Sequence, residues 1–261
     1  MNEFTDGAWN FVSTHTSLVL SEIQTHIVIS VEAVAIAVAV GVPLGVWLGH
    51  IHRFSFLAIN VSNVGRALPS VAILAILLPF TGIGRVDVVI ALVVLAFPPI
   101  LTNSYVAVDQ VDADVVDAAK GIGLRPWQVL MRTEIPLGLP LIFAGIRTSA
   151  VFVVATATLA GIFGGGGLGD IINNRESYGL DGVIAASYLV ILLAFAVQIL
   201  FLVLERVVTP AGLRAGRGQR RRRRLLRQAP TDSGDDISTE LATEKGGPKE
   251  DALAAVSDRA Q

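Results

Sequence analysis

The fold class is decided by one stretch of the sequence, IVISVEAVAIAVAVGVPLGVWL, which runs from Ile27 to Leu48. Its single ionisable residue is Glu32, and every other position is apolar, small or uncharged. About 20 mostly apolar residues are enough for an α-helix to cross the hydrocarbon core of a bilayer. We therefore expect this stretch to be a transmembrane helix and the chain to be an all-α membrane protein.

The composition of the whole chain agrees with that expectation. Of 261 residues, 52% are hydrophobic and only 16% are charged, with a mean hydropathy of +0.63. The charges crowd toward the end of the chain, so the net charge of −2 says little about partners. The absence of Cys excludes disulfides, thiolate metal sites and Cys nucleophiles.

Four more stretches outside the first have the length and apolarity of membrane spans. The second candidate begins with a polar turn and contains Pro69, which is expected to bend or unwind it. The five predicted spans are about Ile27–Leu48, Ile59–Phe80, Val86–Val108, Leu137–Phe163 and Val183–Val208.

Lys and Arg in the connections predict the orientation, because they concentrate on the cytoplasmic side. Residues 1–25 contain neither, nor a compact apolar run, so we expect an extracytoplasmic segment without a cleavable signal peptide. The membrane domain is then 26–209, and 210–261 is a cytoplasmic tail. The basic residues assigned to the inner side are Arg53, Lys120, Arg125, Arg132 and the run from Arg206 to Arg227.

The tail after Pro210 is first basic and then acidic, with too few large apolar residues to build a core. It is predicted to be disordered. Its Arg block is interpreted as an anchor to anionic lipid at the inner leaflet rather than a nucleic-acid site, because a membrane span precedes it.

The connection from Asp109 to Pro136 is long and is predicted to fold. Apolar residues recur in it at helical spacing, Gly121 and Gly123 interrupt the pattern, and Pro126 suits the first turn of a second short helix. An apolar helical face exposed on the cytoplasmic side needs a partner surface. The alternative is an ordinary amphipathic loop that packs on its own bundle.

Within this connection, Asp117-Ala118-Ala119, then Gly123, then Ile135-Pro136 resembles the EAA loop of ATP-binding-cassette (ABC) importer permeases. Asp117 stands where that pattern has Glu, Thr133 where it has Ile, and Ile135 where it has Leu. The resemblance implies a coupling helix that inserts into an ATPase subunit. Its residues would be Asp117, Ala118, Ala119, Gly123, Ile135 and Pro136.

Flanking motifs extend the resemblance over residues 26–210. They are similar to permeases for osmoprotectants such as glycine betaine, carnitine and choline, with methionine-type or other amino-acid permeases as the alternative. The motifs are Pro69-Ser70-Val71-Ala72, Gly82-Ile83-Gly84, Ala144-Gly145-Ile146-Arg147 and Gly165-Gly166-Gly167-Leu168-Gly169.

This resemblance implies the ABC transmembrane type-1 fold in the plasma membrane of a prokaryote. It also implies a transport subunit that moves its solute inward by alternating access. The expected partners are an ABC ATPase dimer that uses ATP-Mg, a second permease, identical or not, and an extracytoplasmic solute-binding protein.

The chain itself is not expected to be an enzyme or to bind a cofactor. None of Lys120, Lys245 and Lys249 follows Gly as a phosphate-binding P-loop requires. A Gly-rich stretch at 164–169 follows a membrane helix rather than a strand, so we interpret it as a flexible external turn, with an outer gate or docking surface as the functional alternative. The four His residues lie near predicted membrane edges, and no metal site is predicted.

Ionisable and polar groups within spans mark a candidate translocation path. Glu32 is either a carboxylate at the outer interface or part of the access route for a cationic solute. A secondary transporter would usually show an inverted repeat, and a membrane-embedded enzyme would need clustered His, Asp or Glu; neither pattern is found. The candidate path residues are Glu32, Asn63, Pro69, Ser70 and Thr156.

Overall fold

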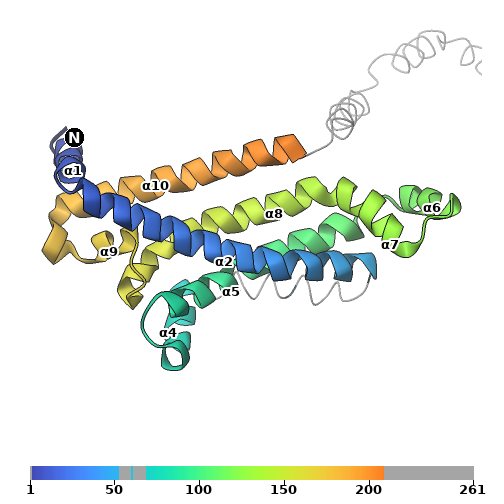
Figure 1. Cartoon of the computed structure of the whole chain (residues 1–261), viewed down its shortest axis with the longest axis horizontal. Helices are drawn as coiled ribbons and strands as arrows, with labels where there is room; N and C mark the ends of the chain where they lie inside the picture. The colour runs from blue at the N-terminus through green and yellow to red at the C-terminus, as the bar shows by residue number, and fades with distance from the viewer. Residues whose placement is uncertain (1, 53–59, 61–68, 209–261) are drawn as a thin grey trace, which may run out of the picture. The chain divides into compact units, whose positions relative to one another are not determined.

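The computed structural model describes residues 2–52, 60 and 69–208, and all the elements in these ranges are helices (Figure 1). Most are α-helical, with one π-helical segment (η1) and one 3-10 segment (η2) flanking α8. In chain order they are α1 (Asn2–Thr14), α2 (Thr16–His50), α4 (Ser70–Thr81), α5 (Arg85–Asp109), α6 (Ala113–Gly121), α7 (Pro126–Val129), η1 (Leu130–Glu134), α8 (Ile135–Thr156), η2 (Ala157–Phe163), α9 (Leu168–Asn173) and α10 (Arg175–Val208).

Four helices in the described ranges are long and apolar enough to cross a membrane, and they contain the first, third, fourth and fifth predicted spans. Their bounds are Thr16–His50, Arg85–Asp109, Pro126–Phe163 and Arg175–Val208. The second predicted span falls largely outside the described residues, and its described part is the shorter apolar helix α4. The count of five spans therefore stays a prediction, as does the disordered tail, which also lies outside the described residues.

Helix α5 packs against both α2 and α8, and the three helices run alongside one another in Figure 1. Gly41, Gly45 and Gly49 repeat every four residues of α2, so they share one helix face. A Cβ built at Gly45 would lie 2.6 Å from the carbonyl oxygen of Leu101, and one at Gly49 would lie 2.6 Å from that of Tyr105. These glycines therefore let the two backbones approach closely, as small residues do between membrane helices.

Helix α8 approaches α5 in the same way from another side. A Cβ at Gly138 would lie 2.5 Å from the carbonyl oxygen of Ala107, and one at Gly145 would lie 2.6 Å from the Cβ of Asn103. The hydroxyl of Ser149 donates a 2.9 Å hydrogen bond to the Ala96 carbonyl. Helices α2, α5 and α8 thus form one closely packed core, which we call the three-helix core.

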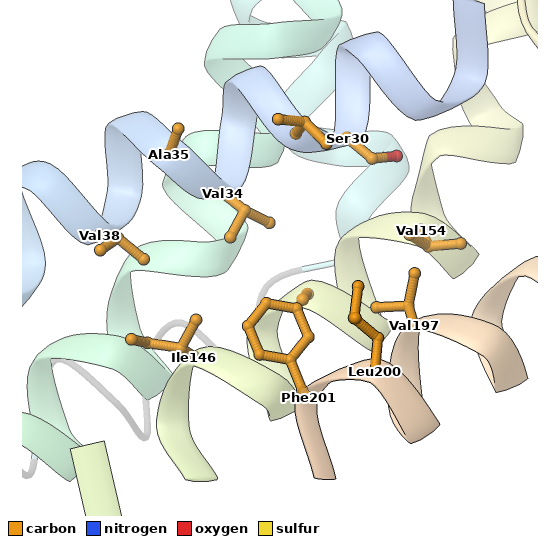
Figure 2. Close-up of a pocket in the computed structure, with 11 residues that line it drawn as sticks. Ser30, Val34, Ala35, Val38, Ile146, Val154, Val197, Leu200 and Phe201 are labelled. Atoms are coloured by element: carbon orange, nitrogen blue, oxygen red, sulfur yellow. The ribbon is translucent and has the colours of Figure 1, made fainter. Parts of the chain in front are cut away.

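Helix α10 packs more loosely. Its backbone leaves the helical conformation at Gly179, where φ is 66°, and most of its large apolar side chains beyond Val190 are exposed. An apolar crevice of about 340 Å³ separates its middle from α2 and α8 (Figure 2). Toward its end, Arg147 of α8 donates a 2.8 Å hydrogen bond to Glu205 of α10.

The stretch 164–169 is expected from the sequence to be a flexible turn, and the structure corrects this. A Cβ at Gly169 would lie 1.9 Å from the carbonyl oxygen of Thr158, and one at Gly167 would lie 3.3 Å from His26. His26 is buried, and its Nε2 donates a 2.9 Å hydrogen bond to the carbonyl of Val154, which lies in the last turn of α8 before η2 begins. The turn is therefore tightly packed, and His26 is a core residue rather than an interfacial one.

Candidate functional site

The segment between α5 and α8, residues 110–134, contains α6, α7 and η1 and lies at the opposite end of the bundle from α1 and α9 (Figure 1). Asp112 begins α6 by accepting a 3.1 Å hydrogen bond from the backbone N–H of Asp114. Gly123 follows the helix with φ at 88°, a conformation that favours glycine. Pro126 is the first residue of α7. The predicted order of helix, glycine turn and helix is confirmed.

One face of this segment is its own small core. Val116, Ala119 and Val129 are buried together, with Val111 and Leu124 packed against them. These contacts fold α6 onto α7 without help from a partner. The segment is therefore a preformed knob at the end of the bundle rather than a loose loop.

The face of α6 next to this small core is apolar and exposed. Val115 and Ala118 lie three residues apart on that face, and Ile122 follows at a spacing of four, directly after the last residue of the helix. The side chain of Ile122 is 81% exposed, and that of Trp127 at the start of α7 is 65% exposed. We call these four residues the knob face. Exposed large apolar groups clustered in this way mark an interaction surface.

The six residues predicted to form a coupling loop take three different positions. Asp117 and Ala118 are exposed on α6, where Asp117 pairs with Lys120 at 3.3 Å. Ala119 instead faces the inner core, and Gly123 forms the turn. The remaining two, Ile135 and Pro136, begin α8 and are partly buried.

Sequence reasoning missed Ile122 and Trp127 as members of this surface. The signal for Ile122 was present, because it follows Val115 by seven residues and Ala118 by four, which continues their helical spacing. Trp127 carried a weaker signal, a large aromatic side chain directly after the Pro that begins a short helix.

Two histidine–carboxylate pairs attach the ends of this segment to the end of α2. His52 Nδ1 lies 3.0 Å from Asp109 Oδ1, just before the segment begins. His50 Nδ1 lies 2.6 Å from Glu134 Oε2, at the last residue of the segment. The four side chains belong to positions far apart in the sequence, so periodicity gave no sign of either pair.

The predicted path residues are not gathered at one place. Glu32 bonds to Arg85 of α5, with 3.2 Å between Nε and Oε2, and both side chains are about half exposed. Pro69 and Ser70 begin α4, and Thr156 is buried at the end of α8. Asn63 lies outside the described residues, and none of the other four lines the crevice in Figure 2. Within the described ranges, no three His, Asp or Glu side chains form a group that could hold a metal ion.

Apolar helices of membrane length that carry a folded segment with exposed apolar side chains at one end are the architecture of a multi-pass membrane protein with a candidate interaction surface. Residues 41–211 match the family described as binding-protein-dependent transport system inner membrane component. The chain belongs to this family and is a transport subunit of the plasma membrane.

Several curated permeases are similar to most of the chain. The glycine betaine/carnitine/choline transport system permease protein OpuCB of Bacillus subtilis is 38% identical over 204 residues, 78% of this chain and 94% of the relative. The carnitine transport permease protein OpuCB of Listeria monocytogenes is 37% identical, over 81% of this chain and 98% of the relative. The osmoprotectant import permease protein OsmW of Salmonella typhimurium is 32% identical, over 70% and 87%.

The fold is similar to that of a chain in a solved ABC transporter. A chain from inward-facing conformations of the MetNI methionine ABC transporter superposes with a TM-score of 0.66 at 22% identity. The match covers 74% of this chain and 97% of the other. At that identity the likeness shows the fold alone.

Proposed function

We propose that this chain is the permease subunit of an ABC importer that moves small osmoprotectants, of the glycine betaine, carnitine and choline class, into the cell. The observation that carries the substrate class is the identity of 38% with a permease named for those three solutes, over 94% of its length. Methionine and other amino acids remain the alternative substrates, to be separated by the uptake assay below.

The knob face is proposed to dock on an ABC ATPase that binds ATP-Mg, while this chain binds no cofactor itself. Its support is the exposed apolar surface of Val115, Ala118, Ile122 and Trp127, which would be costly to leave in water. The small Ala118 side chain allows close approach. ATP binding would then move the knobs of two permeases, identical or not, and reorient their helices between outward and inward access.

Residues 59–80 are proposed as the second of five membrane crossings, with the first 25 residues outside and the tail inside on lipid. An extracytoplasmic binding protein would deliver the solute. Because the chain has no Cys, single cysteines report the topology without background. A membrane-impermeant maleimide should label Ser13→Cys but not Ser233→Cys in intact cells, and the reverse pattern would invert the topology.

The docking proposal is tested with the complete complex in proteoliposomes, assayed for ATP-driven uptake of glycine betaine, choline and methionine. Ala118→Asp places a charge in the centre of the knob face and should lower uptake about tenfold or more, because an unpaired charge is buried at the interface. Ala113→Asp is the matched control, an exposed Ala outside the knob face at the start of the same helix. It should leave uptake unchanged.

Three results would contradict the proposal in different ways. Normal uptake by Ala118→Asp would show that the knob face is not the surface that contacts the ATPase. Uptake of methionine but of neither betaine nor choline would replace the substrate class. Uptake by the chain alone, without an ATPase, would indicate a secondary transporter.

A further inference from the structure

Both ends of the knob, residues 110–134, are bonded to the same place, the C-terminal end of α2. Asp109 before the knob pairs with His52, and Glu134 at its end pairs with His50. Helix α2 is continuous from Thr16 to His50, so its far end reaches the tightly packed turn at the other side of the bundle. A displacement of the knob therefore has a direct route to α2.

The His50–Glu134 pair is the more sheltered of the two contacts. The side chain of Glu134 is 3% exposed and that of His50 is 21% exposed, against 31% and 58% for Asp109 and His52. In the tautomer that carries its proton on Nδ1, His50 donates this hydrogen bond to the Glu134 carboxylate. The 2.6 Å separation of Nδ1 and Oε2 shows that the two side chains are in direct hydrogen-bond contact. Opening this contact would leave a buried carboxylate unpaired, which is costly.

A π-helical segment directly precedes α8 and determines where the Glu134 side chain lies. Glu134 is the last residue of η1, a five-residue π-helical segment between α7 and α8. A π-helical turn holds more residues than an α-helical turn, so it changes the rotation of α7 relative to α8, and such segments are frequent at functional sites. The segment places Glu134 against α2 while Leu130 packs inward with Val46 and Val108.

We propose that Glu134 and His50 are positioning residues that make α2 move as one body with the knob throughout transport. The inference rests on the proposed docking of the knob face to an ATPase. In this arrangement the ATPase moves the knob, the buried hydrogen bond carries that movement to α2, and the glycine contacts of α2 carry it on to α5.

The test measures solute moved per ATP hydrolysed by the complete complex in proteoliposomes, together with the ATPase rate. His50→Leu should keep the ATPase rate but lower solute per ATP about fivefold or more, the range of a typical coupling between sites. His50→Gln keeps a donor toward Glu134 and should retain most of the coupling. Normal solute per ATP in His50→Leu would overturn the proposal.

The double variant His50→Leu with Glu134→Leu covers the case in which the single variant does not fold. Replacing both partners of a buried pair by apolar groups is often neutral for stability. If the pair only stabilises the structure, the double variant should regain the normal amount of solute moved per ATP. That result would overturn the proposal. If the pair transmits the movement of the knob to α2, the double variant should assemble normally, as checked by size exclusion, but still move less solute per ATP.

Ala118→Asp separates failure of this inference from failure of the proposed function. It should lose ATPase stimulation and uptake together, because the ATPase no longer docks. If Ala118→Asp behaves like the unchanged chain, the docking proposal is wrong. If Ala118→Asp loses uptake as expected while His50→Leu moves the normal amount of solute per ATP, the docking proposal is supported. The proposed role of the His50–Glu134 pair is then wrong.

Discussion

The three-helix core and helix α10 are both apolar and of membrane length, yet they are held by different contacts. In the core, glycines bring the α2 and α8 backbones against α5 with no room for a Cβ. Helix α10 meets the bundle through side chains, leaves a crevice beside α2 and α8, and has one non-helical residue at Gly179. Lipid is as apolar as Leu, so close packing rather than apolarity holds membrane helices together. The core is therefore the rigid part, and the α10 interface is the weaker one.

The largest expected effect comes from filling the space between α2 and α5. Gly45→Leu would place a side chain where even a Cβ meets the Leu101 carbonyl and the Ser104 Cβ at 2.6 and 2.7 Å. We expect a loss of about 3 kcal/mol or more in the free energy of unfolding, because the helices must separate. Thermal unfolding of the purified chain in detergent measures it.

Gly121→Ala is the control for that substitution, since a Cβ there has nothing within 4 Å. It should leave stability unchanged or slightly raised. Equal destabilisation of the two variants would mean that the glycine contacts are not what makes the core rigid.

The next effect compares two leucines of equal size. Leu92 of α5 is 1% exposed, whereas Leu192 of α10 is 64% exposed. Truncating Leu92 to Ala should cost about 2–3 kcal/mol through lost contacts and a residual cavity, and truncating Leu192 to Ala less than about 0.5 kcal/mol. Chemical unfolding in mixed micelles gives both values. A large loss at Leu192 would show that α10 packs on a surface outside the described residues.

A smaller effect is expected at the ion pair that ties α10 to α8. Arg147 and Glu205 are 22% and 21% exposed, so solvent and headgroups screen the pair in part. Arg147→Leu should destabilise the chain by about 1–2 kcal/mol, because it removes a charge-assisted hydrogen bond between the two helices in a partly buried place. Arg147→Leu combined with Glu205→Leu should regain most of that loss in the same unfolding assay. No recovery would mean that Arg147 acts through other contacts.

The difference between the two regions also explains what the sequence could predict. The core spans were found because apolar length is a local property of the chain. The knob was found because Gly123 and Pro126 are local turn and helix-start signals. Helix α1 was missed, since its thirteen residues are too short and too mixed to show as a span.

Contacts between distant positions could not be predicted in the same way. Glu134 and His50 are 84 residues apart, and nothing in either neighbourhood indicates the other. The π and 3-10 segments next to α8 have the composition of ordinary helix, so only packing selects them. The position of His26 just before an apolar run predicts an interfacial side chain, whereas its hydrogen bond to the Val154 carbonyl lies in the interior of the bundle.

The smallest effect is expected at Glu32, which joins the N-terminal half of α2 to the start of α5. Its pair with Arg85 is about half exposed, and exposed ion pairs contribute little and are screened by salt. Glu32→Gln should therefore leave the midpoint of thermal unfolding unchanged in high salt and nearly unchanged in low salt.

The same variant decides between two roles of Glu32 in transport. Because Arg85 offsets the charge of the Glu32 carboxylate, we expect Glu32 to contribute little to the attraction of a cationic solute. The ratio of choline to glycine betaine uptake, measured with saturating binding protein in proteoliposomes, should then match the unchanged chain. A selective loss of choline uptake in Glu32→Gln would instead place this carboxylate on the access route. The N-terminal half of α2 would then line the translocation path and not only the three-helix core.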